Sequence, residues 1–180
     1  MTRILGLSGG PEPGGRTATA VAGILAGAEK QGADTDLLEL SQVPLADVVA
    51  AVDGADAVVL GSPVYRATYT SLLKGVLEGL ERGKGAELTA PLQGKAAAVV
   101  LTGASGHHFL AVNYLRDVLA GFFAVQVLSP GLYLDHGGYV DRSTLTEDSV
   151  ALTAAHGAAL HDLTVCVRSS DALGAMRPLV

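Results

Sequence analysis

The residues with the clearest chemical potential stand near the start of the chain, in the stretch Ser8-Gly9-Gly10-Pro11-Glu12-Pro13-Gly14-Gly15-Arg16-Thr17. An apolar run precedes this stretch and an amphipathic run follows it, so we expect a strand, a loop and the first turn of a helix. Glycines let backbone N–H groups crowd around an anion, and a helix N-terminus presents about half a positive charge. Groups that could donate to the anion belong to Ser8, Gly10, Arg16, Thr17 and Thr19. The combination predicts a phosphate site, although a turn rich in glycine and proline is the simpler alternative.

Two further glycine-containing stretches follow predicted strands. They are Gly61-Ser62-Pro63-Val64-Tyr65-Arg66-Ala67-Thr68-Tyr69 and Thr102-Gly103-Ala104-Ser105-Gly106-His107-His108. The carboxyl ends of parallel strands meet at one edge of a sheet, and ligands bind there at the point where the strand order reverses. We expect both stretches to offer free backbone amides and aromatic surface, which suit a flat, hydrogen-bonding ring. A phosphate beside such a ring predicts a nucleotide.

The rest of the chain supplies the elements that must position these loops. Apolar runs predict strands at residues 3–7, 35–40, 57–60, 96–101 and 125–134. Amphipathic runs predict helices at 17–31, 45–52, 69–81, 108–122 and 145–168, with Thr144 and Glu147 at capping-box spacing before the last. In the fourth helix we expect an inward face made of Leu115, Val118, Leu119 and Phe122. Strands that alternate with helices predict a doubly wound α/β sandwich.

The composition favours one globular domain over residues 1–180, with residues 169–180 as a loose C-terminal tail. Hydrophobic residues make up 49% and charged residues 17% of the 180 positions, which is enough for a real core. The net charge of −6 argues against a nucleic-acid surface, and no run reaches the ~18 apolar residues of a membrane span. The single cysteine, Cys166, cannot form an internal disulfide, and we expect it to be buried. Without a signal-peptide pattern or zinc-like Cys/His spacing, we expect a cytoplasmic protein that holds no metal.

The kind of nucleotide follows by exclusion. Residues 10–17 fit the P-loop pattern G-x-x-x-x-G-[KR]-T, but neither the third nor the fourth predicted strand ends in a carboxylate for magnesium. The dinucleotide fingerprint G-x-G-x-x-G fails at Gly9-Gly10-Pro11, and only Glu39 could serve a ribose. One loop with hydroxyls and a single arginine suits one phosphate dianion better, so a mononucleotide is predicted.

With these three stretches in place, the chain resembles the NADPH-dependent FMN reductase family. The likeness lies in residues 7–19, 61–74 and 102–111, in that order, with Arg116 and Val118-Leu119 downstream of the third stretch. The resemblance implies a flavodoxin-like three-layer sandwich whose five-stranded parallel sheet has the order 2-1-3-4-5. The resemblance is strongest to the flavin reductases that supply reduced FMN to two-component monooxygenases, such as the alkanesulfonate system.

The resemblance implies hydride transfer from NADPH, or from NADH, to FMN. The flavin carries this chemistry, so no side chain is named as catalytic. The resemblance assigns FMN binding to Ser8, Gly10, Arg16, Thr17, Thr19, Pro63, Val64, Tyr65, Arg66, Thr102, Gly103, Ala104, Ser105 and His108. It also implies a homodimer or homotetramer and a flavin-dependent monooxygenase as partner.

Individual roles within that set stay open. The backbone of residues 63–66 would line the pyrimidine side of the ring, and Tyr65 would form a ring wall or a subunit contact. Arg66 would contact the NADPH phosphate or form an exposed ion pair. His108 would contact the start of its helix or lie near the flavin or the nicotinamide.

The chain departs from the family pattern at three positions. Gly10 stands where the family has a serine, Ala104 replaces a glycine, and Asp117 replaces a proline in a slightly shorter helix. These changes leave open whether FMN is exchanged as a substrate or retained. Two other functions also remain: an FMN-retaining quinone or azo reductase, and a flavodoxin-like electron carrier, which the modest net charge disfavours.

Overall fold

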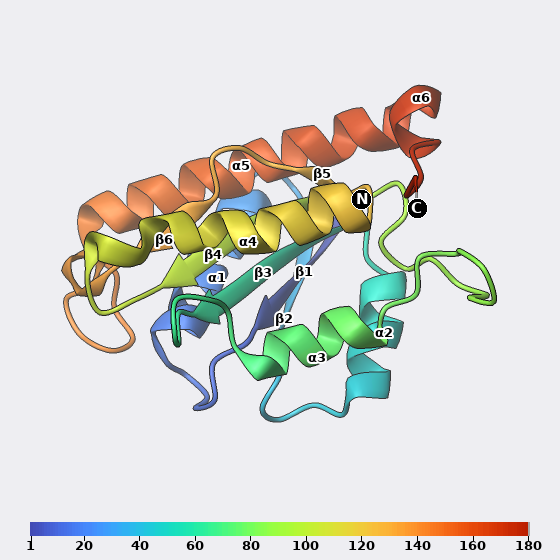
Figure 1. Cartoon of the computed structure of the whole chain (residues 1–180). Helices are drawn as coiled ribbons and strands as arrows, with labels where there is room; N and C mark the ends of the chain where they lie inside the picture. Colours follow the sequence, from blue (N-terminus) through green and yellow to red (C-terminus); the bar gives the residue numbers. More distant parts are fainter. Residues whose placement is uncertain (180) are drawn as a thin grey trace.

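The chain folds around one parallel β-sheet. The computed structural model describes residues 1–179. The strands are β1 (Arg3–Ser8), β2 (Asp34–Glu39), β3 (Ala57–Pro63), β4 (Ala96–Thr102), β5 (Gln126–Val127) and β6 (Leu132–Leu134). Their order is β2-β1-β3-β4-β5, and β6 also pairs with β4 (Figure 1). The predicted doubly wound sheet of order 2-1-3-4-5 is therefore confirmed.

Helices cover both faces of this sheet. The α-helices that pack on the sheet are α1 (Arg16–Glu29), α2 (Leu45–Asp53), α3 (Ser71–Gly79), α4 (Val112–Asp117) and α5 (Glu147–Ser169). Short helical segments are η1 (Gly106–Ala111), η2 (Val118–Phe122), η3 (His136–Gly138) and α6 (Asp171–Gly174). Helices α1 and α5 pack on one face, whereas α2, α3 and α4 pack on the other (Figure 1).

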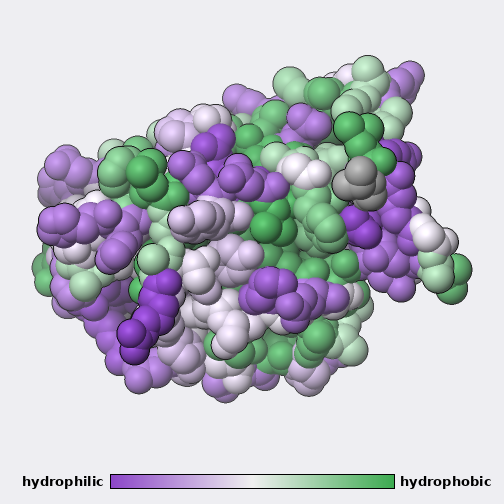
Figure 2. All heavy atoms as spheres, viewed as in Figure 1, coloured by the Kyte–Doolittle hydropathy of each residue, from purple (hydrophilic) through white to green (hydrophobic). Residues whose placement is uncertain are grey.

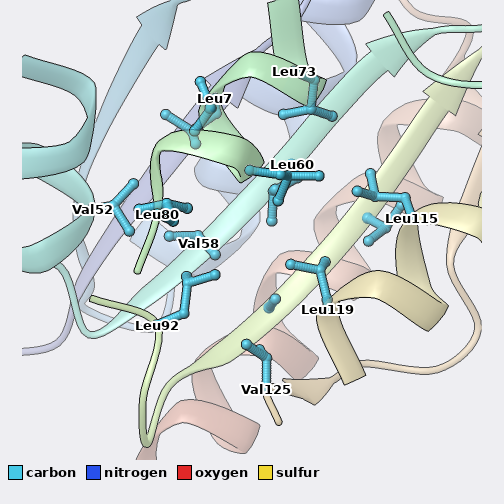
Figure 3. Close-up of a cluster of buried hydrophobic side chains, with 14 of the residues drawn as sticks. Leu7, Val52, Val58, Leu60, Leu73, Leu80, Leu92, Leu115, Leu119 and Val125 are labelled. Atoms are coloured by element: carbon cyan, nitrogen blue, oxygen red, sulfur yellow. The ribbon is translucent and has the colours of Figure 1, made fainter. Parts of the chain in front are cut away.

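Two apolar clusters, one on each face, hold the three layers together. Because successive side chains of a strand point to opposite faces, Val58 and Leu60 of β3 join one cluster while Ala57 and Val59 join the other. Figure 3 shows the first cluster, in which Leu60 lies among side chains from α2, α3 and the α4 region. The central strands β1, β3 and β4 are buried on both faces, which is why their sequences read as continuous apolar runs.

Glycines bring α1 close to the strands and to α5. A Cβ at Gly61 or at Gly6 would overlap the Val21 side chain of α1. On the other side of α1, a Cβ at Gly157 of α5 would overlap the Ile24 carbonyl oxygen. Helix α5 is long and apolar enough to cross a membrane by length and composition alone. In the fold, its apolar residues Leu160 and Val167 belong to the buried cluster beneath α1.

The predicted fifth strand is wrong as a continuous element. β5 pairs with the start of β4, and β6 pairs with its end. Between them, Ser129 and Pro130 are exposed, and proline has no N–H to donate to a ladder. The strand is therefore interrupted where Pro130 stands.

The predicted fourth helix is also divided, into η1, α4 and η2. η2 is a π-helical turn, in which the Phe123 amide donates to the Val118 carbonyl at 3.2 Å. The wider turn shifts the helical phase by one residue. Phe123 is consequently buried, and Phe122, which was predicted to pack inward, is 46% exposed.

Three local predictions near the C-terminus are corrected by the structure. The N-cap of α5 is Thr146, whose Oγ1 accepts from the Ser149 amide at 3.3 Å, rather than Thr144. Cys166 is exposed because it lies on the outer face of α5, away from α1. The segment after Ser169 contains α6, capped by Ser170, where the sequence predicted a loose tail.

Candidate functional site

A cavity of about 520 Å³ lies at the carboxyl edge of the sheet, where β1, β3 and β4 end. β1 has β2 on one side and β3 on the other, so the cavity stands at the point where the strand order reverses. Predicted residues that line it are Gly10, Arg16, Thr17, Pro63, Val64, Tyr65, Thr102, Gly103 and Ala104. Other lining residues are Pro11, Glu12, Gly15, Ala18, His136 and Arg142. The three predicted stretches therefore meet at one cavity.

Residues 9–15, which the sequence predicts to bind phosphate and which we call the phosphate loop, lead into α1 with their backbone donors free. The first helical bond runs from the Thr19 amide to the Gly15 carbonyl at 3.0 Å. The amides of Gly15, Arg16, Thr17 and Ala18 precede that bond, and they have no acceptor among residues 1–179. No described side chain caps the helix start, which leaves these N–H groups available to an anion.

Contacts from distant segments fix the shape of the phosphate loop. The Gly14 amide donates to both carboxylate oxygens of Glu39, at 2.9 and 3.1 Å. At the other end, Thr70 Oγ1 donates to the Gly9 carbonyl at 2.8 Å while it also caps α3. Glu39, considered above as a ribose ligand, instead holds the loop backbone.

Two buried polar atoms beside the phosphate loop lack a partner among the described residues. They are Ser8 Oγ and Arg16 Nε. Ser8 is only 1% exposed, and a buried hydroxyl without a hydrogen bond carries a desolvation cost. A bound anion that accepted from these atoms would relieve that cost, and Ser8 and Arg16 stand at the two ends of the loop.

Tyr139 contacts Arg16 through both its hydroxyl and its ring. Its hydroxyl donates to the Arg16 carbonyl at 3.0 Å, and the Arg16 guanidinium carbon lies 5.7 Å from the centre of its ring. Burial raises the pKa of the Tyr139 hydroxyl, so it stays protonated and remains a donor at neutral pH. Tyr139 is therefore a positioning residue for Arg16.

The loop after β3 does not offer all the free amides that the sequence predicted. The Val64 amide donates to the Thr102 carbonyl at 2.7 Å, and the Tyr65 amide donates to the Thr68 carbonyl at 2.9 Å. Between Tyr65 and Thr68, Arg66 and Ala67 form a two-residue turn with φ of +53° and +67°. Such values are unfavourable for residues other than glycine, and strain of this kind concentrates at binding sites.

The loop after β4 closes the other side of the cavity. Thr102 Oγ1 and Thr17 Oγ1 are 2.8 Å apart and buried, so the third stretch is tied to the phosphate loop. The Gly103 amide donates to the Leu134 carbonyl at 3.0 Å and is also not free. A Cβ at Gly103 would overlap the Tyr133 hydroxyl, which explains the glycine at this position.

The remaining predicted site residues do not line the cavity. Ser8 lies beneath it with its hydroxyl unpaired, and Thr19 Oγ1 donates to the Gly15 carbonyl at 3.1 Å. Ser105 Oγ lies 3.0 Å from His107 Nδ1, and His107 is exposed. The other two residues, Arg66 and His108, are exposed beside the loops.

Sequence reasoning missed a group of residues that come from beyond β6. His136 and Arg142 line the cavity, and Tyr139 supports Arg16. The contact between Tyr139 and Arg16 spans 123 residues of chain, so no local spacing indicates it. Residues 136–138 of this region form η3, with Asp135 Oδ1 accepting from the Gly137 amide at 2.8 Å.

Comparison with known proteins places the chain among flavin enzymes. The family model for NADPH-dependent FMN reductase matches residues 2–138. An NADH-dependent FMN reductase of Pseudomonas putida, SfnF, is 34% identical over 83 residues, which are 46% of this chain and 41% of that protein. The FMN reductase (NADPH) of Escherichia coli strain K12 is 36% identical over 89 residues, or 48% of this chain and 42% of that protein. Each alignment spans less than half the length of the relative.

Solved structures show the same fold. The apo form of an NADH:FMN oxidoreductase, EMOB, superimposes with a TM-score of 0.79 at 24% identity, over 98% of this chain and 97% of that one. A flavodoxin, a WrbA-like protein from Agrobacterium tumefaciens, gives a TM-score of 0.67 at 20% identity, over 92% and 98% of the two chains. The fold is therefore flavodoxin-like, and the family match covers all three strand ends that form the cavity. The chain belongs to the NADPH-dependent FMN reductase family.

Proposed function

We propose that the chain is an NAD(P)H-dependent FMN reductase. One observation carries the proposal: free amides and two unpartnered buried polar atoms converge beside a cavity at the switch point of a flavodoxin-like sheet. Family membership supports the same reading, because the matched region includes the three loops that follow β1, β3 and β4. Relatives dependent on NADH and on NADPH are both similar to the chain, so either nicotinamide is proposed as donor.

The residues at the cavity suit FMN. A phosphate would accept hydrogen bonds from the amides of residues 15–18 and from Ser8 and Arg16, with the Gly10 amide beside them. The ring would lie between the loop of Pro63, Val64 and Tyr65 and the loop of Thr102, Gly103 and Ala104. Thr17 ties the two sides together through Thr102, and Thr19 acts on the loop through Gly15.

Bound FMN would supply the redox chemistry by accepting a hydride from the nicotinamide. The work left to the protein is to hold and orient the two nucleotides and to exclude water. Tyr65 is 54% exposed at the cavity rim, which suits a wall against which a second ring packs. In the strained turn after it, the amides of Arg66 and Ala67 have no acceptor among the described residues, so they are available to the edge of a bound ring. No side chain is needed as an acid or a base.

Assays of NADPH and NADH oxidation, with and without added FMN, test this function. We expect oxidation that depends on added FMN, and a colourless purified protein, if FMN is exchanged as a substrate. A tightly yellow protein that reduces quinones or azo dyes without added FMN would favour the FMN-retaining reductase. Oxidation of neither nucleotide under any of these conditions would contradict both reductases.

We also propose a partner, an assembly and a location for the enzyme. Reduced FMN formed by exchange would pass to a flavin-dependent monooxygenase, as the family resemblance suggests.

Four large apolar side chains on the η1–α4–η2 segment are exposed, which supports a homodimer or homotetramer through this face: Phe109, Leu110, Tyr114 and Phe122. Figure 2 shows apolar surface on the face over which α4 lies. A cytoplasmic location is proposed because nicotinamide nucleotides are available there.

A further inference from the structure

A second arginine, Arg142, lies at the phosphate loop. Its Nη2 is 2.7 Å from Glu12 Oε2, so the two side chains form an ion pair at the mouth of the cavity that both residues line. A Cβ placed on Gly15, the N-cap of α1, would be 3.7 Å from the same Nη2. Arg142 thus lies against the residue whose amide begins the run of free N–H groups. It falls outside residues 2–138, the region that the family model matches.

An ordered hairpin holds Arg142 in this place. Tyr139 and Leu145 pair as an antiparallel bridge, and the Val140 amide donates to the Thr144 carbonyl at 2.9 Å. Tyr139 at the base of this hairpin, residues 139–145, is buried and bonded to Arg16. One hairpin therefore positions both arginines of the cavity: Arg16 through Tyr139 and Arg142 directly.

We propose that Arg142 is a second phosphate-binding residue, which exchanges Glu12 for the phosphomonoester of FMN and so makes the protein prefer FMN to riboflavin. This inference rests on the proposed function. The exchange costs little, because the side chains of Arg142 and Glu12 are 57% and 73% exposed and such exposed pairs contribute little free energy. An arginine that donates to a phosphate dianion through two N–H groups makes a stronger, charge-assisted contact.

Arg142 also determines the balance of charge around the cavity. Among the described lining residues, Arg16 and Arg142 are cationic and Glu12 is anionic. Without Arg142, the Glu12 carboxylate would stand unpaired beside an anion and offset the charge of Arg16. A phosphomonoester also occurs on NADPH, but the position of Arg142 beside Gly15 places it at the phosphate loop, and we therefore assign it to FMN.

Dissociation constants for FMN and riboflavin, measured by flavin fluorescence, test the proposal. The proteins are wild type, Arg142→Gln, Glu12→Gln, the double variant, and Arg177→Gln as a matched control. Among the described residues, Arg177 donates only to the nearby carbonyls of Gly174 and Met176, and it lies beyond α6, near the opposite edge of the sheet. We expect Arg142→Gln to weaken FMN about tenfold, the low end for a charge-assisted hydrogen bond, and to leave riboflavin within about twofold. Glu12→Gln should tighten FMN, and Arg177→Gln should change neither flavin.

The double variant decides between direct contact and charge balance. If Arg142 binds the phosphate, the Arg142→Gln loss persists in the Glu12→Gln background. If the loss vanishes there, Arg142 only neutralises Glu12, and the proposed contact is wrong. An unchanged ratio of FMN to riboflavin affinity in Arg142→Gln, or a KM change confined to NADPH relative to NADH, would also overturn it. Failure of wild type to bind FMN at all would instead contradict the proposed function.

Discussion

At the scale of single residues, Arg16 has the most direct consequence for binding. Its Nε is buried without a partner among the described residues, at the start of a helix whose first amides are free. We expect Arg16→Ala to weaken FMN binding by about 1.5–3 kcal/mol, because a charged hydrogen bond to the phosphate is lost. Titration of flavin fluorescence measures this, with riboflavin as the control ligand. Unchanged FMN affinity would assign the phosphate to the amides, Ser8 and Arg142, without Arg16.

Tyr139 affects the same phosphate contact indirectly, through Arg16. Tyr139→Phe keeps the buried ring and removes the hydroxyl that donates to the Arg16 carbonyl. We expect the free energy of unfolding to fall by about 1 kcal/mol, the net value of one hydrogen bond. FMN should bind a few-fold more weakly, because Arg16 is less well held. Urea unfolding and flavin titration check the two effects. A variant with wild-type values in both would show that Arg16 is positioned without Tyr139.

Residues of the phosphate loop could be predicted because their spacing is local. Glycines, a hydroxyl and an arginine between a strand and a helix indicate an anion site in the sequence itself. Arg142 and Tyr139 could not be predicted this way, because each meets the loop across more than a hundred residues of chain. The amides of Val64 and Gly103 were also misjudged, since their acceptors lie on neighbouring segments that only the folded sheet brings together.

At the scale of elements, the position of the phosphate loop depends on how closely α1 packs against α5. Gly157→Ala would place a Cβ on the Ile24 carbonyl oxygen, so the helices must separate. We expect a loss of about 1–3 kcal/mol in the free energy of unfolding, with weaker FMN binding because α1 carries the loop. Gly75→Ala is the matched control, since α3 is open around Gly75 and the change should stabilise by about 0.5–1 kcal/mol. Equal effects of both substitutions in urea unfolding would refute the close contact.

The elements themselves were largely predictable, and the exceptions have physical causes. The central strands β1, β3 and β4 are buried on both faces, so each appears as a continuous hydrophobic run, whereas no residue of the edge strand β2 is fully buried. The π-helical turn η2 could not be predicted, because residues 118–122 have ordinary helical periodicity and only the burial of Phe123 reveals the shifted phase. Pro130 indicates in the sequence itself that the fifth strand is interrupted, but the predicted strand was extended across it.

At the scale of the whole molecule, the exposed apolar residues of the η1–α4–η2 segment predict self-association. Leu110→Glu places a charge on this face and should lower the mass in solution from that of the oligomer toward the monomer. Val150→Glu is the matched control, because Val150 is similarly exposed but lies on α5, across the sheet. Sedimentation velocity measures the masses. A monomeric wild type, or an equal loss of mass in both variants, would contradict assembly through this face.

Reduction of FMN by NADPH in the absence of oxygen tests the central claim most directly. Catalytic amounts of the protein are mixed anaerobically with NADPH and excess FMN, and the absorbance of oxidised flavin is followed against a sample without protein. NADH replaces NADPH in a parallel sample. We predict that the flavin band bleaches far faster with the protein than without it, for at least one of the two donors. Bleaching no faster than in the protein-free sample with either donor would contradict the assignment of this chain as an FMN reductase.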